Sequence, residues 1–283
     1  MVEPTAKPAR DRVPAVPKIG EDRIAAAFAL REGRAALMPY LMGGFPDMPT
    51  SREIGEAYAA NGADLVELGV PYSDPLADGP VIHAAGTQAL KAGATLDGVL
   101  AVGEALAQRV AVVLMCYVNL IIARGPEQFA KDAADAGISG LIVPDLPLEE
   151  APEIQTACEH HALALVPLVA PTTPDARLAT IGARARGFLY TVSVTGITGE
   201  RERREEEFET VLSRVREHTD VPVAIGFGIS TPAQAAAAAS AGADGVIVGT
   251  RLVRAAAEAD HPAAAAGELV AGLAAGLIPN GCR

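Results

Sequence analysis

Apolar runs and Ala-rich stretches alternate along most of the chain. The apolar runs recur at intervals of roughly 20 to 40 residues, and several of them contain almost no polar position. Runs of this kind are typical of strands that are buried on both faces of a parallel sheet. They predict strands over residues 36–43, 63–70, 110–117, 139–145, 162–169, 186–193, 221–228 and 243–250.

The stretches between the apolar runs have the composition of helices. The clearest examples are residues 51–62, 125–137 and 231–242. Ser51 and Thr231 are predicted N-caps, because a side-chain hydroxyl can accept a hydrogen bond from a free backbone amide. A glycine is predicted to end each helix, because glycine readily adopts the left-handed conformation that closes many helices. These stops are Gly62, Gly137 and Gly242.

This alternation predicts one α/β domain. About eight strand and helix units in roughly 250 residues match the size and rhythm of a (β/α)8 TIM barrel. No linker-like break divides the units, so we expect a single barrel domain over residues 21–283. Residues 1–20 are rich in proline and charge, which predicts a flexible N-terminal extension. A doubly wound open sheet is the alternative fold.

Composition narrows the class of protein. The chain has 283 residues and 50% hydrophobic content, which is ample for a core without disulfide or metal support. The formal net charge of −12 disfavours a nucleic-acid or anionic-membrane partner, because such surfaces need clustered lysine and arginine. A small anionic ligand held by backbone amides is compatible with this charge.

The sequence also carries a prediction of cellular location. No apolar stretch reaches the roughly 18 residues of a membrane span, and the N-terminus lacks the apolar segment of a secretion signal. Cys116, Cys158 and Cys282 are scattered without a C-x-x-C pair, which suits a reducing compartment and predicts ordinary thiols. We therefore expect a cytoplasmic protein with no membrane partner.

Acidic side chains cluster directly after the second predicted strand, in the stretch ELGVPYSDPLADGP. Chemistry in a barrel lies at the carboxyl ends of the strands, where this stretch would fall. Glu67 stands between apolar residues, and desolvation at a dry barrel mouth would raise its pKa towards values that suit an acid or a base. Asp78 follows in the loop. The alternatives are that Glu67 points to a helix and pairs with an arginine, and that Asp78 caps the next helix.

Glycine-containing turns follow the sixth, seventh and eighth predicted strands. Glycine lets the backbone approach an anion closely, and the amides at a helix N-terminus donate hydrogen bonds to it. The turns after the last two strands hold phosphate in many barrels. Gly199, Gly228, Gly249 and Thr250 therefore form a candidate phosphate site, with three unrelated turns as the alternative.

The predicted strand ends lack the residues that Schiff-base chemistry or a metal site would need. Lys7, Lys18, Lys91 and Lys131 are the only lysines, and none falls at a predicted strand end, which disfavours a Schiff base. Of the five histidines, only His83 lies near the barrel mouth, so no metal site is predicted. An acidic pair opposite a phosphate site indicates proton transfer on a phosphorylated small molecule.

The most charged stretch of the chain, residues 193–209, follows the sixth predicted strand. Its glycines could act as hinges of a lid that closes over a substrate. The alternative is that RERREEEFE is the solvated start of a helix with ion pairs four residues apart. Both descriptions can hold if the mobile part ends near Gly199.

Several ordered motifs closely resemble the tryptophan synthase alpha chain family, over about residues 20–278. The most specific is VELGVPYSDPLADGP, supported in the family's order by YLMGGFPD, MCYVNLI, VPDLPLEE, YTVSVTGITGE, IGFGIS and VIVGTRLV. The resemblance implies a (β/α)8 barrel that cleaves indole-3-glycerol phosphate to indole and glyceraldehyde 3-phosphate. It also implies that indole passes to a beta chain in an α2β2 complex, and that pyridoxal phosphate belongs to the beta chain and not to this one.

The same resemblance assigns roles to residues at matching positions. Glu67 matches the catalytic glutamate, Asp78 the catalytic aspartate and Tyr190 the tyrosine beside the indole. Thr198 matches a residue that hydrogen-bonds the aspartate when the lid closes. The phosphate-binding positions are Gly199, Gly228, Gly249 and Thr250. The expected walls of the indole pocket, with core packing as the alternative for the aliphatic ones, are Tyr40, Met115, Tyr117, Ile142 and Phe227.

Two positions depart from the family's commonest pattern. Thr250 stands where serine is frequent, and Val194 stands where arginine is frequent. Three other functions stay open: a lyase that acts without a beta chain, a non-catalytic subunit that only activates its partner, and another phosphate-binding barrel such as a sugar-phosphate epimerase. The intact pair of Glu67 and Asp78 argues against the second, and the missing metal ligands argue against the third.

Overall fold

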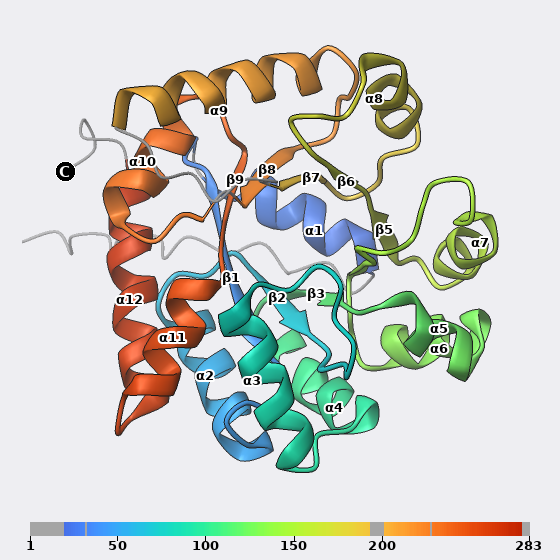
Figure 1. Ribbon diagram of the computed structural model, residues 1–283, viewed down its shortest axis with the longest axis vertical. Helices are drawn as coiled ribbons and strands as arrows, with labels where there is room; N and C mark the ends of the chain where they lie inside the picture. Colours follow the sequence, from blue (N-terminus) through green and yellow to red (C-terminus); the bar gives the residue numbers. More distant parts are fainter. Residues whose placement is uncertain (1–19, 32, 193–200, 227, 279–283) are drawn as a thin grey trace, which may run out of the picture.

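A computed structural model describes residues 20–31, 33–192, 201–226 and 228–278 of the chain (Figure 1). Within them, nine parallel strands form one sheet in the order β5-β4-β3-β2-β1-β9-β8-β7-β6. The strands are β1 Ala36–Met42, β2 Leu65–Gly69, β3 Ala111–Met115, β4 Gly140–Ile142, β5 Ala164–Val166, β6 Leu168–Val169, β7 Leu189–Val192, β8 Val223–Gly226 and β9 Gly245–Val248.

The two edges of this sheet belong to one segment of chain. β5 pairs with β4, β6 pairs with β7, and only Pro167 separates β5 from β6. Pro167 has no backbone N–H to contribute to a ladder, but its carbonyl oxygen accepts from Tyr190 N at 3.0 Å. The segment joins both edges into a nearly closed barrel. The predicted (β/α)8 barrel is therefore confirmed, and the alternative of a doubly wound open sheet is wrong. The fifth predicted strand is split in two, as β5 and β6.

Helices connect the strands and surround the barrel, while α1 lies across it (Figure 1). None of the helices in the described ranges is long and apolar enough to cross a membrane. These helices are α1 Gly20–Ala29, α2 Met48–Ala60, α3 Pro80–Lys91, α4 Leu96–Ala107, α5 Val118–Arg124, α6 Pro126–Asp135, α7 Pro152–His160, α8 Asp175–Gly182, α9 Arg201–Arg216, α10 Pro232–Ser240, α11 Thr250–Glu258 and α12 Pro262–Leu277.

The predicted helix boundaries are confirmed except at the start of α2. Thr231 caps α10 as predicted, and its side chain accepts from the backbone of Gln234. Ser51 is not a cap, because α2 begins earlier and Asp47 caps it. Ser51 is instead buried, and its hydroxyl accepts from Gly44 N at 3.0 Å. The three glycine stops all have left-handed φ angles, namely Gly62, Gly137 and Gly242.

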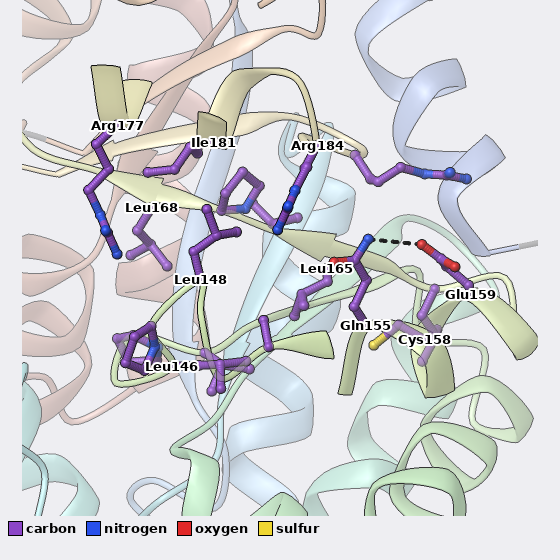
Figure 2. Close-up of a pocket in the computed structure, with 18 residues that line it drawn as sticks. Leu146, Leu148, Gln155, Cys158, Glu159, Leu165, Leu168, Arg177, Ile181 and Arg184 are labelled. Atoms are coloured by element: carbon purple, nitrogen blue, oxygen red, sulfur yellow. Dashed lines mark hydrogen bonds between the residues drawn. The ribbon is translucent and has the colours of Figure 1, made fainter. Parts of the chain in front are cut away.

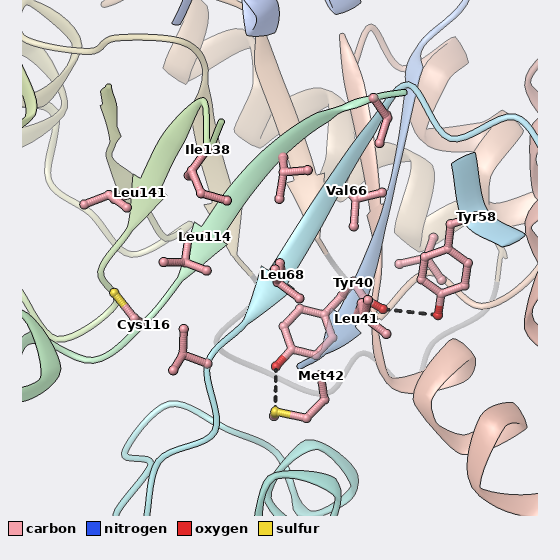
Figure 3. Packing of buried hydrophobic residues seen from close by; sticks show 14 of the residues in the cluster. Tyr40, Leu41, Met42, Tyr58, Val66, Leu68, Leu114, Cys116, Ile138 and Leu141 are labelled. Carbon is pink, nitrogen blue, oxygen red and sulfur yellow. Dashed lines mark hydrogen bonds between the residues drawn. The ribbon is translucent and has the colours of Figure 1, made fainter. Parts of the chain in front are cut away.

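Side chains along β2 alternate between two cores. Along β2, Leu65 belongs to the core inside the barrel, whereas Val66 and Leu68 belong to the core between the barrel and its helices (Figure 3). A residue two positions beyond Leu65 therefore also faces the interior of the barrel.

Helix α1 closes the end of the barrel at which the strands begin. Arg23 of α1 donates to the carbonyl oxygen of Val110, directly before β3, at 3.0 Å. Phe28 is 4% exposed, and its ring centroid lies 5.7 Å from that of Phe188. Because this end is filled with side chains, the carboxyl ends of the strands form the accessible mouth.

The predicted N-terminal extension, residues 1–20, lies outside the described residues except for Gly20, which begins α1. The boundary of the barrel domain at residues 21–283 stays a prediction. Cys116 and Cys158 are buried free thiols, in agreement with the expectation of ordinary thiols, and Cys282 lies outside the described residues.

Replacing Phe28 by alanine should lower the free energy of unfolding by about 3 to 5 kcal/mol, because it leaves a cavity under the barrel core. The matched control is Leu30→Ala, at a residue that is 50% exposed and should change stability by less than about 1 kcal/mol. Urea unfolding followed by circular dichroism measures both. Equal losses in the two variants would contradict the role of α1 as the closed end of the barrel.

Candidate active site

A cleft opens at the carboxyl ends of the strands. Its volume of about 940 Å³ suits a small organic substrate. The ends of several strands and the loops that follow β2, β8 and β9 contribute to its lining. The predicted site residues that line it are Tyr40, Glu67, Asp78, Met115, Tyr190, Gly228, Gly249 and Thr250.

Glu67 lies in the middle of β2 and points into the barrel. Its backbone is in register with Tyr40 of β1 and Val113 of β3. The residue is 1% exposed, and its Oε2 atom has no hydrogen-bond partner within the described structure. Glu67 therefore does not point to a surrounding helix, and the predicted alternative of a pairing with an arginine there is wrong.

Burial changes the acidity of this carboxyl. Desolvation raises the pKa of Glu67 to about 8, and repulsion from Asp78 acts in the same direction. Burial also raises the pKa values of Tyr40 and Tyr190 well above their usual range, and the charge of Glu67 adds to both shifts. Most Glu67 side chains are therefore protonated at neutral pH, and a smaller fraction is ionised.

Two glycines make room for the tyrosine rings at the mouth. A Cβ atom at Gly69 would lie 2.1 Å from the hydroxyl oxygen of Tyr40, and one at Gly226 would lie 2.6 Å from the ring of Tyr190. A larger residue at either position would displace a ring. The Tyr40 hydroxyl makes a long contact of 3.8 Å to the sulfur of Met42, as Figure 3 shows.

Asp78 lies at the edge of the cleft, where Tyr117 holds it. The Tyr117 hydroxyl donates to Asp78 Oδ1 at 2.9 Å and accepts from Ala77 N at 3.0 Å. Burial raises the pKa of Asp78, whereas the hydrogen bond from Tyr117 and the charge of His83 oppose the rise. The N-cap of α3 is Gly79, so the predicted alternative in which Asp78 caps this helix is wrong.

The loop that carries Asp78 is tied to the segment that follows β3. The ring of Tyr72 stacks on that of Tyr117, with centroids 5.2 Å apart. The Tyr72 hydroxyl accepts from Asn119 Nδ2 at 2.7 Å. These contacts fix Tyr117 before any ligand arrives, so that Asp78 is already positioned at the mouth.

The other side of the cleft offers backbone amides to an anion. Gly228 has a φ angle of +65°, a left-handed conformation that glycine adopts at little cost. Gly249 is the N-cap of α11 and provides no side-chain acceptor, so the first amides of this helix are free to bind a ligand. Thr250 is the first residue of α11 and also lines the cleft.

Two arginines that the sequence analysis did not single out also line the cleft. Arg251 and Arg254 lie three positions apart on α11, so they share one face of the helix. Neither forms an ion pair with a carboxylate in the described part of the chain. The stretch GTRLVR could have revealed them, because it places two cations directly after a predicted anion-binding turn.

The remaining predicted residues lie elsewhere. Ile142 is buried in the inner core and does not line the cleft. Tyr117 does not line it either, but its hydroxyl binds Asp78, which does. The charged stretch continues as α9 from Arg201, as the helix alternative predicted. The lid itself falls largely outside the described residues, as do Val194, Thr198, Gly199 and Phe227.

The arrangement suits proton transfer next to a bound anion. A buried carboxyl that holds its proton faces the interior, a second carboxyl stands at the edge, and amides with two guanidinium groups lie at α11. The described ranges contain no group of three or more His, Cys, Asp or Glu side chains that could hold a metal ion.

The stability of the protein should depend on the ionisation of Glu67. Since its pKa is about 8 when folded and near 4.5 when unfolded, wild-type stability should fall relative to Glu67→Gln by about 1.4 kcal/mol per pH unit between these values. Urea unfolding at pH 5, 6.5 and 8 measures the difference. Glu53→Gln, at an exposed position, should show no such trend. A constant difference between wild type and Glu67→Gln would contradict the raised pKa.

Comparison with known proteins places the chain in a family. A model of the tryptophan synthase alpha chain family matches residues 27–274. A tryptophan synthase alpha chain from Synechococcus sp. (strain CC9902) is 50% identical over 238 residues, which cover 83% of this chain and 88% of that one. One from Methanosarcina mazei is 47% identical over 226 residues, which cover 80% of this chain and 83% of that one.

Solved structures share the same fold. A chain of Mycobacterium tuberculosis tryptophan synthase is 40% identical with a TM-score of 0.84, over 90% of this chain and 98% of that one. A tryptophan synthase alpha chain from Legionella pneumophila is 31% identical with a TM-score of 0.84, over 94% of this chain and 100% of that one. The resemblance seen in the sequence motifs is confirmed, and the chain belongs to the tryptophan synthase alpha chain family, lyases that cleave indole-3-glycerol phosphate.

Proposed function

We propose that the cleft cleaves indole-3-glycerol phosphate by a retro-aldol reaction in which Glu67 moves the proton. The products are indole and glyceraldehyde 3-phosphate. The observation that carries the assignment is the Glu67 carboxyl, which lies inside the barrel with an Oε2 atom that no described residue contacts by a hydrogen bond. Such a buried polar atom is costly unless a substrate group meets it.

One carboxyl can serve both proton transfers. Protonated Glu67 gives its proton to C3 of the indole ring. The resulting carboxylate then takes the proton of the side-chain hydroxyl, whose oxygen forms the aldehyde carbonyl as the carbon–carbon bond breaks. The electron pair of that bond returns to the indole ring, and Glu67 is protonated again. A pKa of about 8 keeps both forms of Glu67 populated near neutral pH.

Asp78 has a separate task in this scheme. Positive charge develops on the indole nitrogen when C3 is protonated, and an ionised Asp78 that accepts the N–H hydrogen bond stabilises it. A preorganised acceptor of this kind is often worth several kcal/mol. The hydrogen bond of 2.9 Å from Tyr117 supports the assignment, because it orients Asp78 and opposes its protonation. Tyr40, Met115 and Tyr190 would wall the indole ring.

The phosphate would bind where α10 and α11 begin. Gly228, Gly249 and Thr250 offer backbone amides there, and Arg251 adds a side chain that can form a charge-assisted hydrogen bond. The residues outside the described ranges keep the roles that the family implies, with Gly199 at the phosphate, Phe227 at the indole and Thr198 on the lid.

We also infer that the chain works with a beta chain in an α2β2 complex in the cytoplasm. The beta chain would hold pyridoxal phosphate and receive the indole, and this chain would need no cofactor of its own. Two exposed apolar side chains, one of them lining the cleft at the barrel mouth, support a contact surface for this partner. They are Leu76, which is 86% exposed after β2, and Ile122, which is 61% exposed on α5.

Glu67→Gln should abolish the release of indole from indole-3-glycerol phosphate, because the amide cannot exchange a proton with the substrate. Asp78→Asn should lower the rate by about 100-fold or more through the lost charge. Indole release by the purified chain, with and without purified beta chain, measures both, with Glu53→Gln as the control.

Release that rises with added beta chain would support the partnership. Equal rates with and without it would favour a lyase that acts alone. If Glu67→Gln retained full activity, the proposed role of Glu67 would be wrong. If this variant lost lyase activity but still activated the beta chain, the catalytic and partner roles would be separable.

Arg251→Ala should raise KM for indole-3-glycerol phosphate roughly tenfold and leave kcat nearly unchanged, because the phosphate is held equally before and during the reaction. Arg251→Lys should recover part of the affinity. Arg52→Ala is the matched control, since Arg52 is exposed and pairs with Glu56 on α2. An unchanged KM in Arg251→Ala would show that the backbone amides hold the phosphate without this side chain.

A further inference from the structure

A second cavity lies between α7 and α8, against the split strand formed by β5 and β6 (Figure 2). Its volume is about 160 Å³. The two helices stand apart on this side of the barrel (Figure 1). The side chains that give the cavity its apolar character are Leu146, Leu148, Cys158, Leu165, Leu168 and Ile181.

This cavity is distinct from the catalytic cleft. Pro144 and Leu168 line both spaces and so form the wall between them. Neither Glu67 nor Asp78 lines the second cavity. A ligand bound between α7 and α8 would therefore leave the proton-transfer groups free.

The lining of the cavity favours an aromatic ring. Leu146, Leu148 and Leu165 are only partly buried although they pack against the outer core, because α7 and α8 leave them uncovered. An enclosed apolar cavity of roughly 150 Å³ holds one benzene-sized molecule. The space of about 160 Å³ has this size. The cavity between α7 and α8 is open to solvent along the edge where Arg177, Arg184 and Glu159 lie.

The edge of the cavity provides one cation that is available to a ligand. Arg177 is engaged by both carboxylate oxygens of Glu149, at 2.7 and 2.9 Å, and Arg186 pairs with Glu21. Arg184 has no hydrogen-bonded carboxylate among the described residues, and it points towards the middle of the cavity (Figure 2).

Two carboxylates lie near this cation, and neither forms a hydrogen bond with it. The hydrogen bonds from Arg177 chiefly lower the pKa of Glu149, and the charge of Arg184 adds to the shift, but both Glu149 oxygens are already bound by Arg177. Glu159 also lines the cavity, but its Oε1 atom accepts from Gln155 Nε2 at 3.0 Å (Figure 2). An incoming carboxylate could therefore form a two-pronged hydrogen bond with the Arg184 guanidinium group.

We propose that the cavity between α7 and α8 binds a small aromatic carboxylate. The ring occupies the space between the leucines, and the carboxylate meets Arg184. The residues that precede α1 are a competing occupant, because Glu21 anchors the chain at Arg186 on the edge of this cavity. Charge disfavours them, since residues 1–19 contain four cations and only two acidic residues, namely Lys7, Arg10, Arg12 and Lys18 against Glu3 and Asp11.

Calorimetric titration of the full chain with benzoate tests the proposal, with benzyl alcohol as a neutral probe of similar size. Glycerol 3-phosphate at saturating concentration occupies the catalytic cleft throughout. We expect benzoate to bind in the millimolar range and benzyl alcohol at least about tenfold more weakly. Arg184→Gln should weaken benzoate by about tenfold, and Arg52→Gln should not change it.

A second variant tests the ring site apart from the charge. Leu148→Trp should block benzoate by filling the cavity, while lyase activity confirms that the variant is folded. A crystal of the full chain soaked with 4-iodobenzoate should show the iodine between α7 and α8. The proposal fails if benzoate does not bind, if both variants bind it as wild type does, or if the crystal shows the cavity filled by residues 1–19 or by another copy of the chain.

Discussion

The burial of one carboxyl group, that of Glu67, is the constraint on which the rest of the site depends. Because side chains on a parallel strand alternate, the position two residues after Leu65 faces the interior of the barrel, where burial costs a charge much of its hydration. This places the pKa of Glu67 at about 8. Desolvation suits Glu67 to proton transfer because it raises the pKa of the carboxyl. The same desolvation lowers the stability of the folded chain whenever the carboxyl ionises.

Closure of the barrel maintains this environment. The segment around Pro167 joins the two edges of the sheet, and α1 fills the end where the strands begin. Gly69 and Gly226 then allow Tyr40 and Tyr190 to fold over the interior from the other end. The carboxyl of Glu67 is thus buried by packing from several distant segments and opens only towards the cleft, although its own strand has only five residues.

The distribution of charge explains how an acidic protein can bind an anionic substrate. The net charge of −12 would repel a phosphate on average, yet the cleft presents glycine amides, the start of α11 and the side chains of Arg251 and Arg254. Electrostatics at such a site depends on the nearest groups, because salt screens the distant surface charges. The same argument applies to Arg184 at the second cavity, where the neighbouring arginines are already paired.

The sequence by itself determined the eight strand regions, the glycine stops of the helices and the acidic pair, because each depends on a local pattern of residues, and its ordered motifs identified the family. It could not show that Pro167 splits a strand or that Tyr117 orients Asp78. The stretch GTRLVR places Arg251 after a predicted anion-binding turn, but only the structure shows that this residue lines the cleft. Ser51 was misassigned because its hydroxyl meets a loop and not its own helix. These features join groups from separate segments, so their distances and their shielding from water exist only once the barrel has closed.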